Sequence, residues 1–176
     1  MEFDYDLRSV QEARSLTHEA GIAANQIADF SEEKIDRILR SMVKAAQNNA
    51  VSLAKMAVEE TGFGKAADKT FKNHMASAWV YNAIKDLKTI GVIHEDAEKK
   101  LLDIAEPVGL LLGIVPSTNP TSTVIYKSMI AIKARNAILF SPHPAAAKCT
   151  GLAAKIMHEA AVAAGAPANV IGCLSM

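Results

Sequence analysis

The chain has 176 residues, of which 50% are hydrophobic and 22% are charged, a composition that excludes intrinsic disorder and is typical of a folded domain. Its 19 Lys and Arg residues balance 19 Asp and Glu residues, so the formal net charge is zero. This balance argues against binding to nucleic acid and against attachment to an anionic membrane surface.

The sequence indicates neither a disulfide framework nor a metal site. Its two cysteines, Cys149 and Cys173, lack the spacing of metal ligands and suit a reducing compartment. The N-terminal residues are charged and include no apolar segment, so no secretory signal is expected. The longest strongly apolar run, residues 108–115, is shorter than the roughly 20 residues that cross a bilayer. We therefore expect a cytoplasmic protein without a metal, a nucleic-acid partner or a membrane partner.

The N-terminal half carries apolar side chains at helical spacing. A first helix is expected over about residues 9–27, and Ser31 is placed to cap a second. The predicted apolar face of the second helix consists of Ile35, Ile38, Leu39, Met42, Val43 and Ala46. The apolar stripe of that helix resumes over residues 50–58 and ends at Gly62. A further helix, ending near Gly91, is expected to carry its apolar stripe at Phe71, Met75, Ala78, Trp79 and Ala83.

Short apolar runs bounded by prolines and glycines follow in the second half. The run at residues 108–115 is apolar or glycine throughout, which predicts a strand buried on both faces, as in parallel sheets. Its glycines, Gly109 and Gly113, indicate close backbone packing. Further strands are expected at residues 101–105, 137–140 and 170–174, with helices through Ile125, Met129 and Ile132 and over residues 145–164.

The alternation of strand and helix after the N-terminal helices predicts an α/β fold with a βαβαβ parallel-sheet unit, half of a doubly wound sheet. A three-stranded sheet that stops at this point would expose an unpaired hydrophobic edge. We therefore expect the chain to be the first part of a larger fold.

In such sheets, ligands bind where strands end and helices begin. The turn that follows the strand at 108–115 is polar, and its hydroxyl and amide groups are suited to hold a ribose, phosphate or substrate oxygen. An equally weighted alternative is that these residues only cap the following helix, with Asn119 as N-cap and Pro120 in the first turn. The residues of this candidate site are Ile114, Val115, Pro116, Ser117, Thr118 and Asn119.

A second turn places a histidine between two prolines. His143 could meet a phosphate or an adenine edge, although a lone histidine without a visible partner is more often structural. The residues of this turn that we consider are Ser141, Pro142 and His143. Neither a G-x-G-x-x-G sequence after a strand nor a G-x-x-x-x-G-K-[ST] sequence occurs.

Other polar residues are weaker candidates. The two cysteines fall in a helix and a strand and are expected to be small buried hydrophobes rather than nucleophiles. The pairs Glu59-Glu60 and Lys99-Lys100 are expected to be solvated, and Arg135-Asn136 to cap a helix C-terminus.

Two segments in this order, P-S-T-N-P-T-S from Pro116 and S-P-H-P from Ser141, give the chain a specific resemblance. With the helical stretch from Leu53 to Gly62 and Lys72-Asn-His, it resembles the aldehyde dehydrogenase superfamily over its whole length. More closely, it is similar to the coenzyme A-acylating acetaldehyde dehydrogenases, including the N-terminal part of bifunctional aldehyde–alcohol dehydrogenases.

The resemblance implies an N-terminal helical segment over residues 1–98 and the first part of a Rossmann-like NAD-binding domain over 99–176. It implies oxidation of an aldehyde to an acyl-coenzyme A with NAD, through a cysteine thioester. Residues 114–119 would line the NAD pocket, and residues 141–143 would lie near its adenosine end. Relatives form dimers or larger assemblies, so a homo-oligomer is expected of the full-length parent.

The chain also departs from this pattern. Thr118 stands where non-acylating members carry an asparagine that holds the oxyanion, and Ser141 stands where they carry a ribose-binding lysine. The catalytic cysteine and glutamate of the family do not appear, and neither Cys149 nor Cys173 falls at the catalytic position. The chain alone is therefore expected to be inactive, with no catalytic residue of its own. The alternative is a non-catalytic nucleotide-binding or assembly module that is derived from this family.

Overall fold

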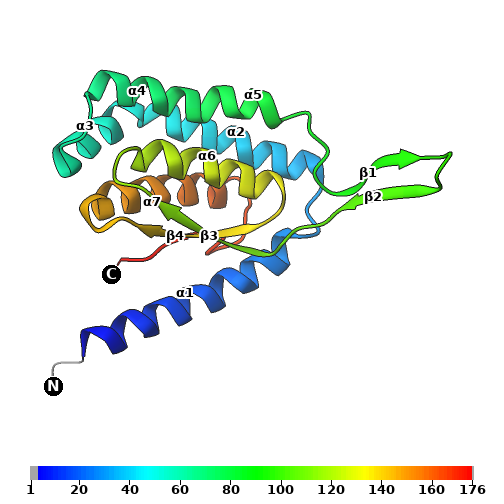
Figure 1. Cartoon of the computed structure of the whole chain (residues 1–176), viewed down its shortest axis with the longest axis horizontal. Coiled ribbons are helices and arrows are strands. Elements are labelled where there is room, and N and C mark those ends of the chain that lie inside the picture. Colours follow the sequence, from blue (N-terminus) through cyan, green and yellow to red (C-terminus); the bar gives the residue numbers. More distant parts are fainter. Residues whose placement is uncertain (1–3, 176) are drawn as a thin grey trace.

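The computed structural model describes residues 4–175. Its first part is helical, with α1 (Tyr5–Ile27), α2 (Glu32–Asn48), α3 (Ala50–Thr61), α4 (Ala66–His74) and α5 (Val80–Ile84), and a π-helical turn, Met75–Trp79, joins the last two. A hairpin of β1 (Gly91–Asp96) and β2 (Leu101–Ala105) follows. The remaining elements are β3 (Leu110–Val115), α6 (Pro120–Lys133), β4 (Ala137–Pro142), a 3-10 turn at Pro144–Ala146, α7 (Ala147–Ala163) and β5 (Ile171–Cys173) (Figure 1).

Helices α2 and α3 form as their sequences predict. The Ser31 hydroxyl accepts a hydrogen bond from the Lys34 N–H at 3.3 Å and caps α2. Asn49 separates the two helices, and Gly62 ends α3 in the left-handed conformation that glycine adopts without strain, at a φ of 70°. The side chains that α2 buries all lie on its predicted apolar face and are Ile35, Ile38, Leu39, Met42 and Ala46.

The predicted burial of the next helix is wrong in part. Phe71 is 56% exposed and Trp79 is 57% exposed, and their rings contact each other edge to face on the surface. Polar Lys69, Asn73 and Ser77 are buried instead; they recur every four residues, and the first two already face inward in α4, before the π-helical turn begins at Met75. The helix also ends at Ile84 rather than near Gly91.

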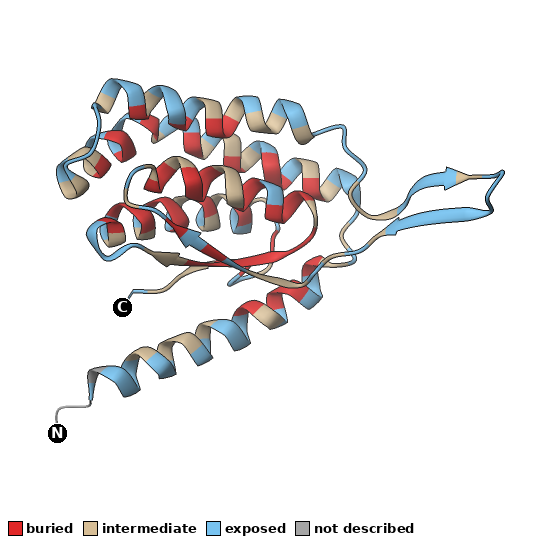
Figure 2. Cartoon of the chain, viewed as in Figure 1, coloured by how far each residue is buried: buried red, intermediate tan, exposed pale blue. Residues whose placement is uncertain are grey.

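Residues from Gly91 onward form a β-hairpin. The strand at 101–105 is confirmed, and its antiparallel partner β1 was not predicted. The hairpin projects from the body of the molecule, and most of its side chains are exposed (Figures 1 and 2). A strand with so little buried surface has no alternation of apolar and polar residues from which it could be recognised.

The βαβαβ unit is confirmed. Strands β3, β4 and β5 lie side by side in that order and are parallel, with α6 and α7 as the connections. The two helices cover one face of the sheet, and α1 lies on the other side, where it mainly contacts β4 (Figure 1). The largest fully buried side chains come from these elements and from α2 and α3, and they include Phe140, Met129 and Met157.

The prediction that the strand at 108–115 is buried on both faces is wrong. Gly113 and Val115 face the core, whereas Leu112 is 64% exposed and Ile114 is 71% exposed. The reason is that α6 covers only one face of β3, so burial alternates along the strand. Close packing is confirmed for Gly113, where a Cβ would lie 2.7 Å from Phe140 Cδ1, but Gly109 precedes the strand, has open space around it and adopts a φ of 103°.

Candidate functional site

The two predicted turns meet at one edge of the sheet. Strand pairing sets Ile114 opposite Ser141 and Val115 opposite Pro142. Beyond the last pair, the His143 N–H donates a hydrogen bond to the Val115 carbonyl at 3.0 Å. Because parallel strands end at the same edge, residues far apart in sequence form one continuous corner, residues 114–119 together with 141–143, which we call the strand-end corner.

The side chains in this corner differ in their exposure to solvent and in their polarity. Pro116, Thr118 and His143 are exposed, and Ser117, Asn119, Ser141 and Pro142 are half-buried. Ile114 is exposed on the sheet face away from α6. Val115 is 1% exposed, so its side chain belongs to the core. The structure therefore brings the predicted residues together, but the polar groups that face solvent come from positions 117–119, 141 and 143.

Asn119 and Pro120 begin α6 at the positions predicted for them, N-cap and first turn. The Asn119 side chain makes no capping hydrogen bond; its Oδ1 instead accepts one from Lys72 Nζ at 3.0 Å. The structure therefore contradicts the alternative that the Asn119 side chain serves only as a helix cap.

Helix α4 supplies contacts to the strand-end corner that the sequence did not reveal. Lys69 is 5% exposed, and its Nζ donates to the Thr118 carbonyl at 2.8 Å. Asn73 is fully buried, and its Oδ1 accepts from the Thr121 hydroxyl at 2.9 Å. Lys69, Lys72 and Asn73 share one helix face at spacings of three and four, which we call the α4 contact face. The sequence of a polar helix face does not indicate whether solvent or another segment of the chain covers that face.

His143 is held by its own turn. Its Nδ1 accepts a hydrogen bond from the Ala145 N–H at 3.1 Å. A neutral imidazole that accepts at Nδ1 carries its hydrogen on Nε2, so an exposed donor remains. The histidine therefore both caps the turn and presents a donor beside Ser141.

Glu60 is not solvated as expected. Its carboxylate accepts hydrogen bonds from the backbone N–H groups of Lys148 at 2.8 Å and Cys149 at 2.7 Å, at the start of α7. Burial raises the pKa of Glu60, but the hydrogen bonds from Cys149 and Lys148 outweigh burial and leave this pKa below its ordinary value. The N-terminus of α7 is therefore occupied by a protein carboxylate and does not offer these N–H groups to a phosphate.

A cavity of about 510 Å³ lies between α7 and β5. Its first lining residue in the chain, Ala147, follows His143 by four positions. Among residues 4–175, His158 Nδ1 has no hydrogen-bond partner, and burial lowers the pKa of this imidazole. The polar and small residues that line the cavity include Lys148, Gly151, Lys155, His158, Gly172 and Ser175.

Neither cysteine has the surroundings of a nucleophile. Cys149 is fully buried, and burial together with the neighbouring Glu60 carboxylate raises the pKa of its thiol to about 12. Burial and the charge of Glu12 raise the pKa of Cys173 to about 11. Both groups stay protonated near neutral pH, so they behave as small apolar side chains.

Two further properties hold for the part of the chain that the structure describes. No helix within it is both long and apolar enough to cross a bilayer. No cluster of three or more His, Cys, Asp or Glu side chains within it is arranged to hold a metal ion.

The family model of the aldehyde dehydrogenase family matches residues 4–175. The chain belongs to the aldehyde dehydrogenase family. This membership confirms the resemblance seen in the P-S-T-N-P-T-S and S-P-H-P segments, and the similar structures confirm the α/β fold expected from the alternation of strands and helices.

Similar proteins place this aldehyde dehydrogenase chain near the acylating branch. It is 50% identical to the bifunctional aldehyde-alcohol dehydrogenase AdhE of Escherichia coli over 93% of its length, and 45% identical to an aldehyde-alcohol dehydrogenase of Clostridium acetobutylicum over 97%. The structure of an acetylating aldehyde dehydrogenase from Geobacillus thermoglucosidasius matches 99% of the chain at 55% identity, with a TM-score of 0.95.

The aldehyde dehydrogenase chain is much shorter than these relatives. It spans 18% of the Escherichia coli protein and 19% of the Clostridium acetobutylicum protein. It spans 39% of the Geobacillus chain.

Proposed function

We propose that the chain forms the N-terminal part of an NAD-dependent, coenzyme A-acylating aldehyde dehydrogenase and contributes residues 114–119 and 141–143 to its cofactor site. The observation that carries this proposal is the meeting of two polar turns at the ends of β3 and β4, with His143 bonded to Val115 across them. Ligands bind at such strand ends in open α/β sheets.

The groups at the strand-end corner fit the ribose and adenine portions of a dinucleotide. The hydroxyls of Ser117, Thr118 and Ser141 and the Nε2 hydrogen of His143 can bond ribose oxygens or an adenine edge. A pyrophosphate is not expected at the start of α7, because Glu60 accepts the free N–H groups there. Two exposed lysines that line the cavity, Lys148 and Lys155, are cations available to a phosphate.

Coenzyme A is the proposed co-substrate. Similar structures include a propionaldehyde dehydrogenase of Rhodopseudomonas palustris with bound CoA, 27% identical, and an engineered glycolyl-CoA reductase with bound NADP+, 26% identical. The half-buried serine at position 141 leaves more room than a lysine would, which supports a corner that admits either nucleotide in turn.

The proposed reaction converts an aldehyde, coenzyme A and NAD+ into an acyl-coenzyme A, NADH and a proton. NAD supplies the hydride acceptor when it is bound. The residues of this chain bind and orient the nucleotide, and we assign none of them a bond-making step. The raised thiol pKa values of Cys149 and Cys173 support this assignment, because a catalytic nucleophile needs an accessible thiolate.

Several finer expectations remain proposals. We propose a cytoplasmic location, because both cysteines are free, and a homo-oligomeric parent enzyme. The division into a helical segment, 1–98, and part of an NAD-binding domain, 99–176, is also a prediction. A non-catalytic nucleotide-binding or assembly module is the second candidate function, and the exposed hairpin, residues 91–105, gives it a surface for assembly.

A thermal-shift titration tests nucleotide binding. NAD or coenzyme A that binds only the folded chain should raise its stability by about 2.7 kcal/mol at a concentration one hundred times the dissociation constant. Replacing His143 with Ala should weaken the shift, whereas His94→Ala, in the exposed hairpin, should not. No shift with either nucleotide up to millimolar concentration would refute the proposed site.

A separate assay addresses activity. The purified chain with aldehyde, coenzyme A and NAD should produce no NADH above the uncatalysed rate. Steady NADH formation that depends on both aldehyde and coenzyme A would show that the chain holds a nucleophile we have not identified.

A further inference from the structure

We propose that Lys69 is a positioning residue for nucleotide binding, because its buried ammonium fixes the conformation of residues 116–119. This inference rests on the proposed function, since it concerns the same strand-end corner. Because the Lys69 side chain is 5% exposed, we assign it no direct contact with a bound nucleotide. It lies in α4 and acts through the Thr118 carbonyl, which accepts its hydrogen bond at 2.8 Å.

The first support is the free-energy cost of burying a lysine side chain at position 69. The Lys69 side chain is 5% exposed, and burial, with a smaller contribution from the charge of Lys72, lowers the pKa of its ammonium. A buried charge is expensive, and an apolar side chain of similar volume often stabilises a fold as well or better. Packing alone therefore does not explain why a lysine occupies this position.

The second support is where the contacts converge. Three side chains of the α4 contact face bond to three neighbouring positions of the chain: Lys69 to the Thr118 carbonyl, Lys72 to the Asn119 amide and Asn73 to the Thr121 hydroxyl. Asn73 is itself fixed, because its Nδ2 donates to the Ala50 carbonyl at 3.0 Å. The residues just before and at the start of α6 are thus attached to α4 by three side-chain hydrogen bonds.

The third support is where the other restraints act. They hold the two ends of this segment, through the His143 bond to the Val115 carbonyl and the Lys72 bond to the Asn119 side chain, whereas Lys69 holds the Thr118 carbonyl between them. Pro116 and Thr118 are exposed, and the Asn119 side chain does not cap α6. An exposed loop without such a contact samples several conformations, and the apparent affinity for a ligand falls with the fraction that is competent to bind. Lys69 is therefore expected to raise nucleotide affinity by keeping the corner in one conformation.

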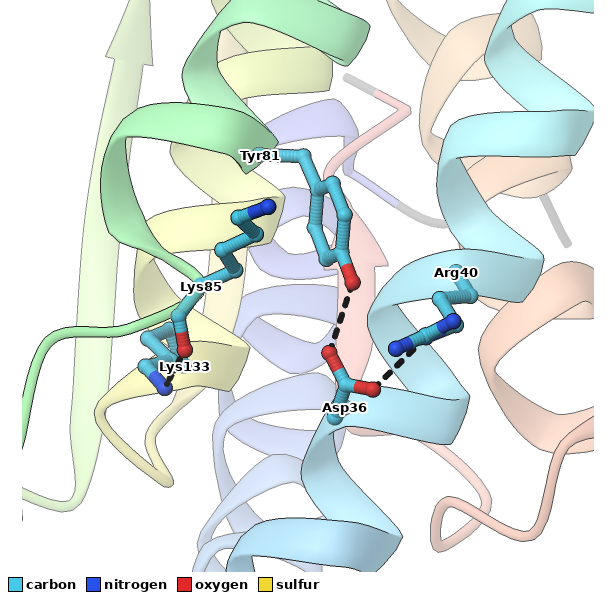
Figure 3. Close-up of polar contacts among 5 residues, drawn as sticks. All are labelled: Asp36, Arg40, Tyr81, Lys85 and Lys133. Carbon is cyan, nitrogen blue, oxygen red and sulfur yellow. Dashed lines mark hydrogen bonds and ion pairs between the residues drawn. The ribbon is translucent and has the colours of Figure 1, made fainter.

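A matched control exists in the same chain. Lys133 is 7% exposed, and its Nζ donates to the Lys85 carbonyl at 2.8 Å, the same kind of contact at the opposite end of α6 (Figure 3). Thr118 and Lys85 are both exposed residues, so either carbonyl can bond to water when its lysine is removed. Lys69→Met and Lys133→Met therefore each remove one hydrogen bond from a buried lysine to a backbone carbonyl, near the corner and far from it, and Lys133→Met also removes a charge that acts on Asp36.

The experiment measures two quantities on the full 176-residue chain: the dissociation constant for NADH by its fluorescence, and the backbone 15N order parameters of Ser117, Thr118 and Asn119. In Lys69→Met, the order parameters should fall from about 0.85 to below about 0.6. The dissociation constant should rise about tenfold, as expected when one conformer in ten is competent. Lys133→Met should change neither quantity, and the urea midpoints of both variants should stay close to that of the wild type.

Other results would overturn the inference. One is that the order parameters of residues 117–119 stay high in Lys69→Met, whether or not the affinity falls. The other is that these order parameters fall equally in Lys133→Met. If the wild-type chain does not bind NADH, the proposed function fails, and the order parameters still decide whether Lys69 positions the corner. Lys69→Gln, one bond shorter but able to bond with water, replaces the methionine variant if that variant does not fold.

Discussion

The phenolic hydroxyl of Tyr81 donates a hydrogen bond to Asp36 Oδ1 at 2.7 Å and joins α5 to α2, although the two residues lie 45 positions apart (Figure 3). Arg40 Nε donates to the other carboxylate oxygen at 2.6 Å. Burial raises the pKa of Asp36, but the hydrogen bonds from Tyr81 and Arg40 and the charges of Arg40 and Lys133 outweigh it, so the pKa lies below its ordinary value.

Replacing Asp36 with Asn should lower the free energy of unfolding by about 1 kcal/mol at neutral pH, the usual contribution of such hydrogen bonds. A carboxyl whose pKa is lower in the folded state stabilises the fold above its unfolded pKa of about 4. The difference between wild type and variant should therefore shrink as the pH falls through the lowered pKa.

Urea unfolding at a series of pH values measures this difference. Asp29→Asn, at an exposed position, is the control and should show little change. A difference that grows toward acidic pH would contradict the assigned direction of the Asp36 shift.

Glu60 should stabilise the start of α7 in a similar way. In Glu60→Gln, the amide keeps one acceptor but turns an NH2 group toward the second backbone N–H, so we expect a loss of about 1–2 kcal/mol. The loss should be present above the unfolded pKa and should disappear as the pH falls, because the folded pKa of Glu60 is lowered. Thermal or urea unfolding measures it, and the exposed neighbour Glu59→Gln serves as the control. Equal losses in the two variants would show that the capping contact has no special role.

Gly113 should not tolerate a side chain. A Cβ there would lie 2.7 Å from Phe140 Cδ1 and 3.3 Å from Ile138 Cδ1, so Gly113→Ala requires the core to shift and should cost about 1–3 kcal/mol. Gly21 lies within α1 with open space around it, and Gly21→Ala should stabilise the chain by up to about 1 kcal/mol. Denaturant midpoints of the two variants should thus move in opposite directions, and a neutral Gly113→Ala would mean that β3 and β4 pack less tightly than the structure shows.

The thiols should be unreactive in the folded chain. With a pKa of about 12, Cys149 is a thiolate in only about one molecule in ten thousand at pH 8. Alkylation by iodoacetamide, followed by mass spectrometry, should therefore modify Cys149 only as fast as the chain unfolds. Urea-denatured chain is the positive control and should react at both cysteines. Fast modification of folded protein would mean that the thiol is accessible.

Elements with a strong repeating pattern could be predicted from the sequence. Helix α2 was predicted with its buried face, and β4, α6, α7 and β5 were predicted in order, because periodic apolar residues and flanking Gly and Pro are local signals. The hairpin strand β1 and the outward Trp79 could not be predicted, since a projecting strand and a π-helical turn leave no such signal.

The sequence by itself determined the family, the order of helices and strands from β2 onward, and the two polar turns that begin at Pro116 and Ser141, because each depends on residues that are close in the chain. Only the tertiary structure decided that these turns share one corner, that Lys69 contacts Thr118 and that Glu60 occupies the start of α7. The last two contacts join residues 49 and 89 positions apart. Their formation depends on how the helices pack against the sheet. The sequence does not indicate whether water or a backbone group becomes the partner of a charged side chain.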